Sequence, residues 1–141
     1  MTLLATSDKP LSNAIKCELP KNMSRKTVIL NVDSDTTIKI NTVLGAVTAG
    51  GKFRPAVQTA GDGSESFAGI LVALPDNEAE KTFTAATDYE VVVLEKDAMV
   101  SYEGLVVDAS YNLQAEIDTL VDEMEAAGVR VAENRPIGPL L

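Results

Sequence analysis

The sequence from residue 26 to residue 107 is a series of short β-branched and aliphatic segments separated by turn signals. Turns are indicated by Asp33-Ser34-Asp35 and Gly50-Gly51, while Pro55 restricts its segment to a sheet edge or an irregular path. Many short strands at this close spacing predict a mostly β, small β-clip or barrel-like domain rather than alternating strands and helices. The expected strand segments are 26–32, 36–40, 42–47, 52–57, 66–74, 89–95, 99–102 and 105–107.

The apolar period changes after residue 110. Five apolar residues then recur at helical spacing: Leu113, Ile117, Leu120, Val121 and Met124. This spacing predicts one C-terminal α-helix over residues 111–127, which packs the apolar face onto the β-rich body. Ser110 or Asn112 could cap its start, Gly128 suits its end, and residues 129–131 can form a last strand.

Residues 1–22 contain two prolines, Pro10 and Pro20, and little sustained pattern, so we expect a flexible, extended N-terminal arm. Within it, three apolar residues alternate with Lys16 and Glu18 at the period of a strand: Ile15, Cys17 and Leu19. This segment could pair when a partner supplies a sheet edge, or it could be the first strand of the domain itself. The expected organisation is an arm (1–22), a β-rich domain including the helix (23–131) and a tail (132–141).

Composition removes several classes of function. The chain has no His and one Cys, Cys17, so it cannot build a Ser-His-Asp triad, a Cys-His dyad, an internal disulfide or a His- or Cys-based zinc site. The net charge is −9 and aromatic residues make up 4% of the chain, which disfavours nucleic-acid binding. No apolar run is long enough to span a membrane and the N-terminus does not resemble a signal peptide, so we expect synthesis in the cytoplasm.

Three local motifs favour ordinary structural readings. The segment Asp62-Gly63-Ser64-Glu65 lacks the full calcium-binding loop and predicts a solvated loop. The acidic residues around Asp76 and Glu80 are not positioned for acid/base chemistry, and Gly50-Gly51 is not followed by a phosphate-binding signature. We therefore expect no catalytic residue, metal or cofactor.

Five motifs in order point to a family. The segments are SRKTVIL (24–30), INTVLGAVTAGGKFRPAV (40–57), DGSESFAGILV (62–72), YEVVVLEKDAMV (89–100) and the closing GVRV (128–131). Over about residues 24 to 131 they resemble the lambda-type bacteriophage head decoration proteins. Asn41 stands where that family usually has Ala or Gly before the Thr-Val-Leu-Gly run.

The resemblance implies a non-enzymatic structural protein of the virion. Family members form homotrimers of β-clip-type domains that sit on the outer surface of the expanded head and reinforce it against packed DNA. The resemblance also implies that the N-terminal arm orders against the major capsid protein. On this basis the partners are other copies of the chain and the capsid protein, without nucleic acid or membrane.

The residues of the arm that we expect to contact the capsid follow from its alternating pattern and its positive charge. They are Ile15, Lys16, Cys17, Leu19, Lys21 and Arg25. Residues 1–30 carry five basic and two acidic residues, in contrast to the acidic remainder. Two alternatives stay open: a tail or fibre component of a phage, and a small trimeric β-clip enzyme that depends on carboxylates.

Overall fold

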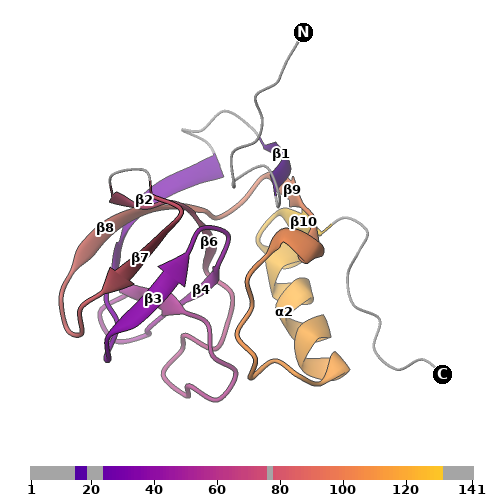
Figure 1. The fold of residues 1–141 in the computed structure, drawn as a ribbon. Helices are drawn as coiled ribbons and strands as arrows, with labels where there is room; N and C mark the ends of the chain where they lie inside the picture. Colours follow the sequence, from indigo (N-terminus) through magenta and orange to yellow (C-terminus); the bar gives the residue numbers. More distant parts are fainter. Residues whose placement is uncertain (1–14, 19–23, 76–77, 132–141) are drawn as a thin grey trace, which may run out of the picture.

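A closed five-stranded barrel forms the body of the protein in the computed structural model, which describes residues 15–18, 24–75 and 78–131 (Figure 1). β2 pairs antiparallel with β8 over its whole length, whereas β5 joins β2 through the single pair Leu30–Phe53. Pro55 is the last residue of β5 and lies in regular register opposite Leu44 of β4, so its segment is neither an edge strand nor irregular there. Around the barrel the strands are β2 (Arg25–Leu30), β5 (Phe53–Pro55), β4 (Val43–Ala46), β6 (Gly69–Ala73) and β8 (Tyr89–Leu94).

Two smaller sheets are attached to the barrel. β3 (Thr36–Lys39) pairs antiparallel with β7 (Glu80–Phe83). β9 (Ala98–Val100) is the central strand of a three-stranded sheet, with β1 (Ile15–Glu18) on one side and β10 (Val129–Val131) on the other. A short 3₁₀ turn, η4 (Tyr102–Gly104), follows β9, and the helix α2 (Gln114–Ala126) leads into β10. Figure 1 shows α2 beside the barrel, below the three-stranded sheet.

β6 and the last residues of β8 are apolar on both faces because each face is buried in a different core. Leu71 on β6 and Val93 on β8 point into the barrel, where they join the first core cluster. Their neighbours Ile70 and Leu94 point outward into a second cluster, which also contains residues of α2 and of the three-stranded sheet. Since successive side chains of a strand alternate between faces, the continuous apolar runs of β6 and β8 follow from burial on both sides.

The fold class expected from the sequence is confirmed: a mostly β, barrel-like domain with a C-terminal helix. Most expected strands are present within a few residues of the expected bounds, and Gly128 ends the helix with a φ of 95°. β7 was not expected, because Glu-Lys-Thr-Phe carries one apolar residue and its strand depends on pairing with β3. Residues 105–107 do not form a strand; Val106 makes an isolated bridge to Thr42.

The start of the helix differs from the sequence prediction. α2 begins at Gln114, and the residue before it is Leu113, which has an extended backbone and a side chain that is 60% exposed. Neither Ser110 nor Asn112 caps the helix, because the Ser110 hydroxyl accepts a hydrogen bond from the Gln58 backbone instead. Glu116 reaches back, and its carboxylate accepts the Leu113 N–H at 3.2 Å. The apolar face therefore begins at Ile117 rather than at Leu113.

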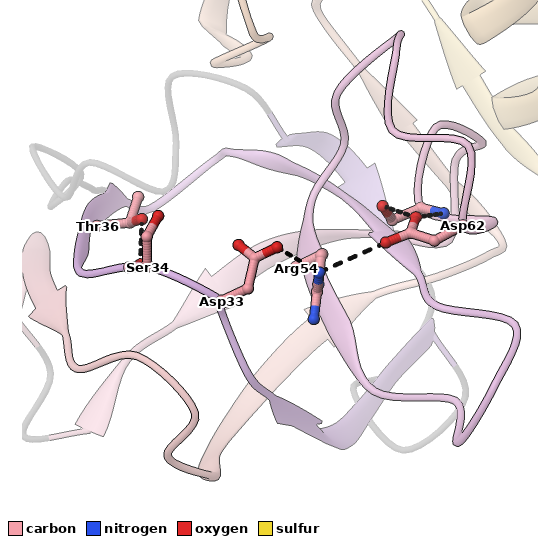
Figure 2. Close-up of polar contacts among 6 residues, drawn as sticks. Asp33, Ser34, Thr36, Arg54 and Asp62 are labelled. Atoms are coloured by element: carbon pink, nitrogen blue, oxygen red, sulfur yellow. Dashed lines mark hydrogen bonds and ion pairs between the residues drawn. The ribbon is translucent and has the colours of Figure 1, made fainter.

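The loop after β5 is tied to the barrel by ionic and hydrogen bonds (Figure 2). Arg54 Nη1 lies 3.3 Å from an Asp33 carboxylate oxygen and 3.4 Å from an Asp62 carboxylate oxygen. Asp62 also accepts hydrogen bonds from the Ser64 hydroxyl and the Ser64 N–H, and these bonds, together with Arg54, lower the pKa of Asp62. Ser64 is fully buried against Gly45, so the prediction of a solvated loop is wrong at this residue.

Candidate functional site

The N-terminal segment joins the body as an edge strand. β1 pairs antiparallel with β9, with Ile15 opposite Val100, Cys17 opposite Met99 and Glu18 opposite Ala98. The register shifts between Ile15 and Cys17, so β1 contains a bulge-like irregularity. Among the described residues no strand pairs with the other side of β1, which leaves that edge open. Of the two possibilities for this segment, the structure therefore shows a strand of the domain's own sheet.

One face of the three-stranded sheet is buried in the hydrophobic core of the protein. Ile15, half-buried, packs against the second core cluster. Val100 and Val129 belong to that cluster and are fully buried. Arg130 follows Val129 and is exposed, as the alternation of a strand requires. The sheet thus has an apolar inner face and an outer face that is open to solvent at Arg130.

The helix α2 packs against the inner face of this sheet. Leu120 and Met124 lie in the same cluster as Val100 and Val129. Strands of three or four residues are too short to be stable alone, so β1 depends on its pairing with β9 and on the core that Ile15 shares with α2.

Two hydrogen bonds lock α2 and the segment before it onto the barrel. The Glu123 carboxylate accepts the Phe67 N–H at 2.9 Å, and the Tyr111 hydroxyl donates to the Glu65 carbonyl. Burial and the nearby carboxylate of Glu123 raise the pKa of Tyr111 to about 12. Tyr111 thus stays a neutral donor at all ordinary pH values, and the helix is held at a fixed position.

The junction between the sheet and the barrel is also well defined. Ser24, which is buried, accepts the Glu95 N–H at 3.0 Å and donates its hydroxyl to the Asp97 carbonyl at 3.2 Å. Arg25, directly after it, begins β2 and pairs with Leu94. These contacts bring the start of β2 next to the turn that leads into β9.

The structure places the expected contact residues in two groups. Ile15, Lys16 and Cys17 lie in β1, and Arg25 is at the start of β2 on the same end of the molecule. Leu19 and Lys21 lie outside the described residues, as does most of the expected arm. Sequence reasoning could not find β9 as the partner of β1, because strand pairing across 80 or more residues leaves no local signal.

Neither metal chemistry nor a membrane helix is indicated. Within residues 15–18, 24–75 and 78–131 there is no group of three or more His, Cys, Asp or Glu side chains that could hold a metal ion. In the same ranges no helix is both long and apolar enough to cross a membrane.

Comparison with known protein families gives one decisive result. The family model for the bacteriophage lambda head decoration protein D matches residues 4–129 of the 141-residue chain. The chain belongs to this family. A search of curated proteins found no match. The match confirms the resemblance seen in the sequence and extends it to the N-terminal segment, which the motifs of residues 24–131 had not included.

Membership identifies the chain as a phage head decoration protein, a structural component of the virion capsid. The family is structural rather than enzymatic. In this decoration protein β1 is an edge strand of its sheet, and no strand among the described residues pairs with its other side.

Proposed function

We propose that this decoration protein is a cement subunit that binds as a homotrimer to the outer surface of the expanded phage head and stabilises the head against packed DNA. The observation that carries the proposal is the position of β1. It lies at an open sheet edge, within the region that matches the decoration protein family.

An open sheet edge can bind an extended segment of another protein, because its backbone N–H and C=O groups lack a strand partner. An extended segment of the major capsid protein can add to the edge of β1, so that backbone hydrogen bonds supply affinity. The proposed contact residues are Lys16, Cys17 and Arg25 with Leu19 and Lys21, and Ile15 serves mainly to hold β1 on the body through its packing.

Trimerisation would make such short contacts sufficient. A four-residue strand offers few hydrogen bonds, and one copy alone would dissociate readily. Three linked copies convert the second and third contacts into intramolecular events, which can raise the overall affinity by about 10²–10⁴-fold. A trimer also matches sites of three-fold symmetry, which exist only on an assembled shell.

Co-sedimentation with undecorated, expanded heads tests the proposal. A variant that lacks residues 1–14 keeps β1, whereas a variant that lacks residues 1–22 removes it. We expect the longer deletion to abolish decoration while the barrel remains folded by circular dichroism. Saturation of heads at wild-type concentrations by the longer deletion would place attachment elsewhere on the body.

Two further measurements address the rest of the proposal. Native mass spectrometry should give a particle of three times the 14.9 kDa chain mass. Decorated heads should retain their DNA at a higher temperature than undecorated heads. Gold-labelled protein should be found on heads rather than on tails or fibres in electron micrographs, and labelling of tails would favour the alternative of a tail component.

A further inference from the structure

We propose that the docking surface extends beyond the N-terminal segment to two cations of the later sequence, Lys96 and Arg130, and that it fits an acidic segment of the capsid shell. This inference rests on the proposed function and names the chemistry of the partner that the same site would bind.

Lys96 and Arg130 come together through the pairing of β9 and β10. Lys96 lies in the turn before β9, and Arg130 is the central residue of β10, opposite Met99. A side chain built at Gly128 would place its Cβ 3.7 Å from the Lys96 Cβ, so the turn lies directly beside the start of β10. Both cations are exposed, and no ion pair found among the described residues includes either of them.

These cations belong to one end of the molecule, which we define as the docking end: residues 15–18, 25–26, 95–100 and 128–131. The docking end carries five basic and three acidic residues, whereas the other described residues carry four basic and fifteen acidic residues. Glu125, outside this set, lines the same hollow as Arg130. The basic residues of the docking end are Lys16, Arg25, Lys26, Lys96 and Arg130, and its acidic residues are Glu18, Glu95 and Asp97.

The excess of basic residues attracts an acidic partner to the docking end. The excess of acidic residues on the rest of the protein repels the same partner. Backbone hydrogen bonds at the edge of β1 supply affinity, but they do not select one strand over another. Complementary charge supplies that selection and steers the approach, because an acidic surface is attracted to the docking end and repelled by the acidic remainder of this chain, whose total net charge is −9. β9 lies between β1 and β10, so Arg130 carries the positive charge across the sheet to the edge opposite β1, and Lys96 lies in the turn before β9.

Charge-reversal variants test this surface in the head-binding assay. Lys96→Glu and Arg130→Glu should each raise the concentration for half-saturation of undecorated heads about ten-fold at low ionic strength, since an attraction becomes a repulsion. Lys39→Glu is the matched control, because Lys39 is an exposed lysine on β3, outside the docking end. The difference from the control should shrink at about 0.5 M salt, where exposed charges are screened.

Crosslinking tests whether Lys96 itself lies next to a carboxylate of the capsid protein, and Lys96→Arg is the control because it keeps the positive charge but has no amine. A carbodiimide couples lysine amines to nearby carboxylates, so Lys96 should form a crosslink to an Asp or Glu of the capsid protein that mass spectrometry can locate. Lys96→Arg should retain binding and lose this crosslink.

The outcomes are distinguishable. Equal binding by wild type and both reversal variants, or an equal loss in Lys39→Glu, would overturn the inference and leave the proposed function in place. Failure of the wild-type protein to bind heads would refute the proposed function and this inference with it.

Discussion

Replacing Leu120 by alanine tests whether α2 is an integral part of the fold. Leu120 is 1% exposed and lies in the second core cluster, beneath the three-stranded sheet. Leucine to alanine removes three carbon atoms, and at about 0.8 kcal/mol for each buried CH₂ group the transfer term is about 2.4 kcal/mol. A residual cavity adds to this, so the free energy of unfolding should fall by about 2–5 kcal/mol.

Leu113 provides a matched control on the same element. The sequence places both leucines on one helical face, but Leu113 precedes the first turn and is 60% exposed. Leu113→Ala should therefore reduce the free energy of unfolding by less than about 1 kcal/mol.

Urea denaturation of the three proteins at one protomer concentration measures both values. A fixed concentration is needed because any oligomer makes the apparent stability depend on mass action. A loss for Leu120→Ala no larger than that for Leu113→Ala would refute the buried position of α2 against the barrel.

Three further predictions concern Gly45, Asn41 and Tyr111. Gly45→Ala should cost about 1–3 kcal/mol or more in urea denaturation, because the new Cβ would meet the Ser64 carbonyl oxygen. Asn41 has a φ of 77°, so Asn41→Gly should be tolerated and Asn41→Val should destabilise by about 1–3 kcal/mol, as thermal unfolding can show. The pKa of Tyr111 is raised from 10.0 to about 12 in the folded state, so its contribution to stability is complete below pH 10 and is lost as the pH rises toward 12. Tyr111→Phe should lack that part of the alkaline loss, and a tyrosinate absorbance titration should find Tyr111 among the last tyrosines to ionise in the wild-type protein.

The sequence predicts those elements whose signal is local. Ile70, Leu71 and Val72 form a continuous apolar run, and the structure explains it by two cores that bury alternate residues on opposite faces of the barrel wall. The end of α2 was likewise predictable, since Gly128 adopts the positive φ that a residue after a helix often needs.

The elements that sequence reasoning could not settle depend on distant partners. Whether residues 15–18 form a strand of the domain depends on Val100, and β7 depends on β3 across 40 or more residues. The spacing of Leu113 fits the buried face of a helix, but its extended backbone places it before the first turn. The position of Arg130 opposite Met99 also arises only when β10 pairs with β9.

The core that α2 shares with β1 suggests how this helix supports the proposed function. Ile15 of β1 and Leu120 of α2 pack against the same cluster, so loosening the helix loosens the strand whose edge is proposed to bind the capsid. A docking strand held on a rigid body loses less conformational entropy on binding than a free segment does. Under the proposed function, the helix contributes to attachment without touching the partner, because it packs in the same core as Ile15 of β1.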